Sequence, residues 1–439
     1  MALLTKRVII SLLSGILIGT LIINNFSPFL VLQALSDLFV QLLSTPWMLK
    51  TFGFMFLMGA LMHLMQRSGG VDGFVHMLTH RLSLVKSDRA ALILVYIIGV
   101  VLFIETSISV LVAGAVGRPV CDAQEVSRAK LAYVCDSTSA PVGSLIMFNG
   151  YGALMLGLIT AQMDLGLIKG ESIAWLLEAL SMNFYSILAL VVTFIVIWFR
   201  IDIGPMRHTK VIHEIAQVTK GSNPWYMIAP VILMLSGVFF FLYLTGDGDI
   251  LKGSGSSAIF YTMVMSVTLV GLFFILKGIL SVKEVTTEIS KGVKSMLGIN
   301  VVLLLSFGIG QVTTDMHTGT FLASYANMAL SPLFLSALIF ILAAIISFST
   351  GTSWGTFSIM IPIAIPLAVA LDADIALVIA AVISGGIFGD HCSPISDTTI
   401  VTSMATGCDH IEHVKTQLPY ALIVALFSVL LFILFAWIR

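Results

Sequence analysis

Apolar runs dominate the chain from end to end, and most are long enough to cross a membrane. A transmembrane helix needs about 20 mainly apolar residues. Runs near this length, or longer and broken ones, occur at 8–30, 48–66, 91–116, 131–161, 173–199, 226–244, 257–277, 297–311, 332–371, 376–404 and 418–438. The pattern predicts an all-α integral membrane protein without a soluble domain.

Basic residues in the short loops indicate how the helices thread the membrane, because such loops stay cytoplasmic. The Lys6–Arg7 pair predicts a cytoplasmic N-terminus, and segment 24–47, which has no basic residue, is expected as an outer loop. The loops at 67–90 and 117–130 are both basic. The segment between them, 91–116, should therefore enter and leave by the inner face as a re-entrant hairpin.

The second half of the chain is predicted to have the same order of elements with inverted membrane topology. Segment 332–371 should form a hairpin from the outer face, and 376–404 a broken transmembrane helix that corresponds to 131–161. Two inverted-topology repeats with discontinuous helices are a plan of secondary transporters. The predicted parts are a first inverted repeat at 1–199, a cytoplasmic loop and linking transmembrane helix at 200–256, and a second inverted repeat at 257–439.

Composition narrows the functional classes further. The chain is 58% hydrophobic and only 10% charged, whereas soluble domains carry about 25% charged residues. The net charge of −1 gives no basis for nucleic-acid binding. The cysteines show no framework spacing and are expected as free thiols; they are Cys121, Cys135, Cys392 and Cys408.

Two acidic motifs interrupt the apolar pattern where the chain should lie in lipid. They are Asp136–Pro141 in the first half and Gly389–Thr399 in the second. Ionisable groups at bilayer depth are costly, so they indicate an ion or substrate site. Pro141 and Pro394 are predicted to break their helices and to free backbone carbonyls that can bind a cation.

We expect Asp136, Asp390 and Asp397 to bind Na⁺ or H⁺, with Glu105 at the first hairpin tip as a further acid. A buried carboxylate can hold either ion, and competition between the two is antiport. Nearby hydroxyl oxygens should coordinate the ion or a substrate, because hard cations favour oxygen; they are Thr138, Ser139, Thr352, Ser353, Ser393, Ser396 and Thr398. The alternative is that these small residues only allow helices to pack closely.

Histidines near the second motif leave two interpretations open. His391 can carry a proton near neutral pH, or it can be a hydrogen-bonded core residue. The run Cys408–His413 resembles a metal cluster only loosely and is expected in a cytoplasmic loop.

The motifs together resemble the NhaC-type sodium/proton antiporter family of the ion-transporter superfamily. The matching stretches are Arg128–Pro141, Gly389–Thr399 and Cys408–Tyr420. The resemblance implies a secondary transporter of the bacterial inner membrane and places three aspartates at the family's acidic positions: Asp136, Asp390 and Asp397. Many relatives have paired acids in the first hairpin, where this chain has only Glu105, so the ion stoichiometry stays open.

Three functions of different classes follow from these observations. The first is Na⁺/H⁺ antiport through the membrane-embedded aspartates. The second is Na⁺- or H⁺-coupled transport of a small organic solute, an amino acid or a carboxylate, with Trp354 or Tyr151 as a wall of the pocket. A remote third is an intramembrane aspartyl enzyme with a carboxyl dyad. No cofactor is expected beyond Na⁺ and H⁺ as coupling ions, and a homodimer is an open expectation because such carriers often form dimers.

Overall fold

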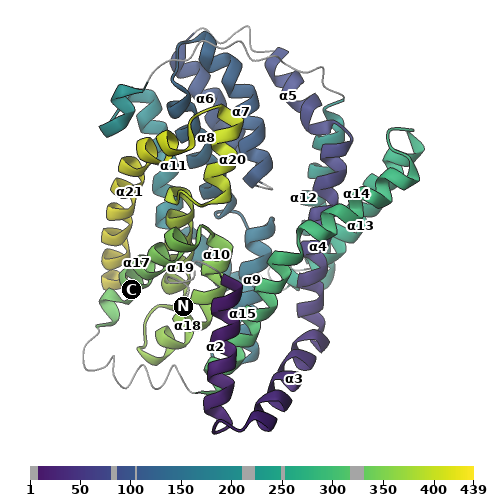
Figure 1. The fold of residues 1–439 in the computed structure, drawn as a ribbon, viewed down its shortest axis with the longest axis vertical. Coiled ribbons are helices and arrows are strands. Elements are labelled where there is room, and N and C mark those ends of the chain that lie inside the picture. Colours follow the sequence, from purple (N-terminus) through teal and green to yellow (C-terminus); the bar gives the residue numbers. More distant parts are fainter. Residues whose placement is uncertain (1–7, 81–86, 104–105, 210–222, 249–252, 317–330) are drawn as a thin grey trace.

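A computed structural model describes residues 8–80, 87–103, 106–209, 223–248, 253–316 and 331–439 (Figure 1). This part of the chain is helical and contains no β-strand. The elements are α2 (Val8–Ile23), α3 (Pro28–Ser44), α4 (Pro46–Arg67), α5 (Gly70–His80), α6 (Asp88–Val101), α7 (Thr106–Ala123), α8 (Arg128–Gly143), α9 (Gly150–Asp164), α10 (Ser172–Ser181), α11 (Phe184–Phe199), the 3-10 helix η2 (Gly204–His208), α12 (Trp225–Thr245), α13 (Gly255–Leu276), α14 (Val282–Ser295), α15 (Leu297–Asp315), α17 (Pro332–Thr350), α18 (Ser353–Ala370), α19 (Ile375–Cys392), α20 (Asp397–Thr406) and α21 (His410–Ile438).

The predicted all-α membrane class is confirmed by the length and apolar character of these helices. Large apolar side chains such as Leu430 and Trp437 stay exposed on α21, as expected of a helix that faces lipid. Eight segments among the described residues are long and apolar enough to cross a membrane: Pro46–Arg67, Ser172–His208, Trp225–Thr245, Ser256–Leu276, Pro332–Thr350, Ser353–Ala370, Ile375–Cys392 and His410–Ile438.

Both segments predicted as hairpins fold into two helices that pack against each other, α6 with α7 and α17 with α18. Gly351 ends α17 with a φ of 69°, in the left-handed region that favours glycine. A Cβ on Gly351 would lie 2.7 Å from the Ile395 carbonyl oxygen, so the turn also needs glycine for space. The tip of the first hairpin includes Glu105, which lies outside the described residues. Entry and exit by one membrane face stays a prediction for both hairpins.

Each long broken segment forms two helices separated by a short irregular stretch. In the second half α19 ends at Cys392, Pro394 lies in the interruption, and α20 begins at Asp397. In the first half the break lies at 144–149 instead of at Pro141, which stays inside α8. Proline removes only one backbone hydrogen bond, and near a helix end the remaining turn can continue.

Three loops or spans expected from the sequence differ in the structure. Segment 24–47 is not a loop, because it contains α3, whose apolar side chains alternate with polar ones and leave no run of spanning length. Span 173–199 lies within the spanning segment Ser172–His208, but it is divided into α10 and α11 at Asn183 instead of forming one helix. The stretch between the predicted spans 257–277 and 297–311 holds Lys283, Lys291 and Lys294 and is expected from the sequence as a loop. It forms the amphipathic helix α14, which begins with a capping box between Ser281 and Glu284.

Helices α8 and α19 lie at the centre of the molecule. Every residue of α8 is buried, and α19 is buried along almost its whole length. Glycines allow α19 to approach α17 at backbone distance: a Cβ on Gly385 would lie 2.3 Å from the Phe340 carbonyl oxygen. Helices α4, α12, α13 and α14 pack together along one side of this centre (Figure 1). The two acidic motifs are therefore carried by the two most enclosed helices.

Candidate functional site

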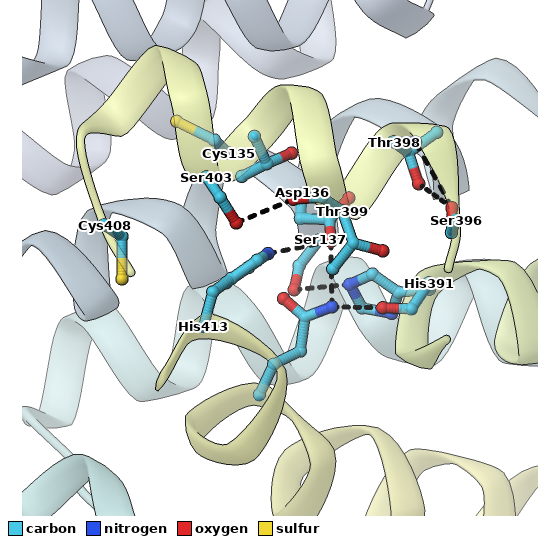
Figure 2. A network of polar contacts seen from close by, with 12 residues as sticks. Cys135, Asp136, Ser137, His391, Ser396, Thr398, Thr399, Ser403, Cys408 and His413 are labelled. Carbon is cyan, nitrogen blue, oxygen red and sulfur yellow. Dashed lines mark hydrogen bonds and ion pairs between the residues drawn. The ribbon is translucent and has the colours of Figure 1, made fainter. Parts of the chain in front are cut away.

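Asp136 lies near the middle of α8 and is fully excluded from solvent. Gln417 Nε2 donates a hydrogen bond to Asp136 Oδ2 over 2.9 Å, and His413 Nε2 lies 3.2 Å from the same oxygen. The other carboxylate oxygen, Oδ1, has no hydrogen-bond partner. Figure 2 shows His413 directed at Asp136 from α21. Side chains of α21 thus satisfy Asp136 Oδ2, whereas Oδ1 can accept an additional ligand.

His391 connects the surroundings of the two aspartates. Its Nε2 lies 3.1 Å from Ser137 Oγ (Figure 2). Its Nδ1 lies 2.7 Å from the Tyr185 hydroxyl. Its backbone oxygen accepts a hydrogen bond from Gln417 Nε2. Both ring nitrogens therefore have hydroxyl partners, which favours the interpretation of His391 as a hydrogen-bonded core residue.

Asp390 is held by hydroxyl groups from two other helices. Ser353 Oγ, at the first residue of α18, donates to Asp390 Oδ2 over 2.7 Å. Ser396 Oγ, at the N-cap of α20, donates to Oδ1 over 2.5 Å and also lies 2.9 Å from Thr398 Oγ1. The N-termini of α18 and α20 thus meet at this carboxylate, where their helix dipoles favour negative charge.

An aromatic pair lies beside the Asp390 site. The Tyr151 hydroxyl is 3.0 Å from Ser353 Oγ, which places it one hydrogen bond away from the carboxylate. Its ring stacks on Trp354 with centroids 5.0 Å apart and an angle of 27°. A Cβ on Gly150 would lie 2.6 Å from Trp354, so glycine allows this contact. Tyr151 and Trp354, the two residues expected from the sequence as walls of a solute pocket, therefore lie side by side at the tip of the second hairpin.

The remaining hydroxyl residues predicted as ligands mostly bond to the backbone. Thr138 Oγ1 donates to the Val134 carbonyl, and Ser393 Oγ donates to the Phe348 carbonyl. Ser139 Oγ donates to the Cys135 carbonyl and lies 2.9 Å from Ser109 Oγ in the first hairpin. Thr352 caps α18 by accepting from the Gly355 amide.

Two acids from the predicted set cannot be placed in this way. Asp397 is the first residue of α20, but its side chain is outside the described part of the structure, as is all of Glu105.

The structure adds two residues that sequence reasoning missed, His413 and Gln417. The expected cytoplasmic loop at 408–413 is wrong from His410 onward, because α21 begins there and carries His413 inward to full burial. The signal was their spacing of four residues, which places both side chains on one helix face. Among the described residues no group of three His, Cys, Asp or Glu side chains is arranged to hold a metal ion.

Two solved transporter structures resemble this chain in overall fold. The chain matches the Alcanivorax borkumensis YdaH transporter with a TM-score of 0.63 at 15% identity, over 93% of this chain and 89% of that one. It matches Neisseria gonorrhoeae MtrF with a TM-score of 0.61 at 11% identity, over 93% and 84% of the two chains.

Sequence relatives identify the family. Residues 148–437 match the model of the Na⁺/H⁺ antiporter family. An uncharacterized protein of Haemophilus influenzae is 33% identical over 451 residues, which cover 97% of this chain and 86% of that protein. An uncharacterized Na⁺/H⁺ antiporter of the same organism is 34% identical over 99 residues, 22% of this chain and 21% of that protein. The chain belongs to the Na⁺/H⁺ antiporter family, which confirms the resemblance and makes it a transporter instead of an enzyme.

Proposed function

We propose that this protein exchanges Na⁺ for H⁺ across a membrane, with Asp136 and Asp390 as the principal ion-binding acids. The observation that carries the proposal is the unpartnered Oδ1 of Asp136, on a side chain with 0% exposure. Membership of the Na⁺/H⁺ antiporter family supports the choice of ions.

A buried carboxylate oxygen without a partner is costly, because it has lost its water and gained nothing in return. Either a proton or a Na⁺ ion at Asp136 would remove this cost, and Na⁺ favours oxygen ligands. The two ions cannot both occupy the same lone pair. Mutual exclusion at one carboxylate that is exposed alternately to the two membrane faces is sufficient for exchange.

Asp390 provides a second acid with a different environment. Its two oxygens accept hydrogen bonds from Ser353 and Ser396, which lie on separate helices. A change in the ion bound at Asp390 would alter the hydrogen bonds by which this carboxylate links the N-termini of α18 and α20. In the proposal Asp397 and Glu105 complete the set of acids.

The membrane arrangement of the proposal follows the charge pattern. We place the chain in the bacterial inner membrane with a cytoplasmic N-terminus, and we place the two halves as inverted repeats about the linking helix α12. The paired hairpins and paired broken helices support this arrangement.

The test is ion flux in proteoliposomes that contain the purified protein and a pH-sensitive dye in the lumen. External Na⁺ should raise the luminal pH without any organic solute, because Na⁺ entry drives H⁺ out. Choline at equal ionic strength is the control. A luminal pH that responds only when an organic solute is added would contradict antiport.

A second candidate function is coupled transport of a small organic solute. The specific observation is the Tyr151–Trp354 stack, one hydrogen bond from Asp390, which offers an aromatic surface beside a charged group. The structural neighbour MtrF is described as one of a class of antimetabolite efflux pumps. Amino acids and carboxylates added to the same liposomes distinguish the two functions, since only the second requires them.

A further inference from the structure

The Gln417 side chain bridges the two acidic motifs. Its Nε2 donates to Asp136 Oδ2 in α8 and to the backbone oxygen of His391 in α19, the residue next to Asp390. The side chain is fully buried on α21. A single amide group therefore links the carboxylate of the first motif with the main chain of the second.

These two contacts also define which way the amide points. Oxygen and nitrogen of a glutamine are assigned from the hydrogen bonds they make. Both neighbours of Gln417 Nε2 are acceptors that have no proton to give, a carboxylate oxygen and a carbonyl oxygen. A flipped amide would place its oxygen against both of them, so Oε1 must point away from the bridge.

Gln417 Oε1 in this orientation is buried and has no hydrogen-bond partner. Asp136 Oδ1 is in the same condition. Asp136 Oδ1 and Gln417 Oε1 are therefore two buried oxygens without a hydrogen-bond partner, and the side chains that carry them are in direct contact through Nε2 and Oδ2. A carboxylate and an amide carbonyl are the kinds of oxygen that bind hard cations.

We propose that Gln417 is a ligand of the transported cation, with Oε1 and Asp136 Oδ1 as coordinating atoms; this rests on the proposed cation site at Asp136. Nε2 has a second role, because its bond to Oδ2 leaves Oδ1 free for the ion. The amide is neutral, so the pair carries one negative charge. When the neighbouring His413 is neutral, one monovalent cation balances that charge, whereas a divalent ion would leave a buried positive charge.

Gln417→Leu tests the proposal, because leucine fills similar space without polar atoms. We expect the Na⁺ concentration for half-maximal exchange to rise about tenfold. The ratio of Li⁺ to Na⁺ half-maximal concentrations should change as well, because a coordinating oxygen contributes differently for ions of different radius. A role in packing alone would weaken exchange of both ions equally and leave the ratio at its wild-type value, which would overturn the proposal.

Gln162→Leu is the matched control. Gln162 is also buried and also has an unpartnered Oε1, but it lies on α9, and no hydrogen bond joins it to Asp136. We expect its replacement to leave both half-maximal concentrations and their ratio unchanged. An equal change of the ratio in both variants would overturn a specific role for Gln417.

A second variant and a binding measurement keep the test decisive if Gln417→Leu does not fold. Gln417→Asn keeps the amide and withdraws it by one methylene. The wild-type protein in detergent should melt at a higher temperature in Na⁺ than in choline, and Gln417→Asn should lose most of this difference. An undiminished Na⁺ effect in Gln417→Asn would contradict the proposal. If wild-type protein exchanges no Na⁺ at all, the proposed function fails first, so the two failures are distinguishable.

Discussion

His413 Nε2 lies 3.2 Å from Asp136 Oδ2, and neither side chain has any exposure to solvent. The pair joins α21 to α8 across 277 positions of the chain. A buried acid and base in contact form either a neutral hydrogen bond or an ion pair. In both forms Asp136 is the side-chain partner of His413, whose Nδ1 has none, while Asp136 Oδ2 also accepts from Gln417.

His413→Leu should therefore destabilise the protein strongly. Leucine removes one of the two side chains that contact Asp136 Oδ2, and breaking a buried ion pair costs about 3 kcal/mol or more. The free energy of unfolding in detergent, followed by thermal denaturation, measures this loss. His63→Leu is the control, because His63 is partly exposed and its contact with Glu288 Oε2 spans 3.4 Å. Equal melting temperatures for His413→Leu and the wild type would contradict a paired His413.

The hydroxyl groups at Asp390 give a second prediction. Ser353→Ala removes one of two serine donors to this carboxylate and should lower stability by about 2 kcal/mol, the usual range for a hydrogen bond to a charged group. Ser358→Ala on the same helix is the matched control, since Ser358 is equally buried but its Oγ has no partner. A thermal shift assay should separate the two variants. Equal melting temperatures would show that Ser353 does not support Asp390.

The crossing of α4 and α14 gives a third prediction. A Cβ on Gly59 would lie 2.3 Å from the Gly292 carbonyl oxygen, so these helices touch backbone to backbone. Gly59→Ala should force the helices apart and cost about 1–3 kcal/mol of stability. Gly298→Ala has open space around its Cβ and should be neutral or slightly stabilising, because alanine is the better helix former. A Gly59→Ala protein as stable as Gly298→Ala would contradict the close crossing.

The sequence predicted the membrane class, the hairpins and the two interrupted helices. Lipid imposes long apolar runs, and breaks in them require glycine, proline and polar groups that are visible locally. The structure places Pro394 in its interruption, but the break near Pro141 lies a few residues later. There Asn149 donates to the Gly143 carbonyl six residues before it, and Asn183 donates to the Ser144 carbonyl from 39 residues further along the chain. Such partners decide where a helix stops and leave no local signal.

Long-range pairing also explains why the sequence did not predict His413 and Gln417 as residues of the candidate site. Gln417 is 281 positions from Asp136, and neither its type nor its position after the polar stretch 408–416 indicates burial. The polar residues at the start of α21 resemble a loop by composition alone. They form a helix because α8 and α19 provide polar partners for them in the core. Partners so distant in the chain do not appear in the local pattern of apolar and polar residues. Helix α3 was missed because its 17 residues, interrupted by Gln33, Asp37 and Gln41, contain no apolar run of spanning length.

The central claim is that Asp136 binds the exchanged ions, and Na⁺-driven alkalinisation of proteoliposomes by Asp136→Asn tests it most directly. Asparagine keeps the size and removes the charge, so the variant should fold and insert but show no more pH change than liposomes without protein. Asp374→Asn is the matched control: Asp374 caps α19 and pairs with Arg439 at the surface, and asparagine keeps the cap. We predict wild-type exchange in Asp374→Asn. Wild-type exchange in Asp136→Asn would contradict the account.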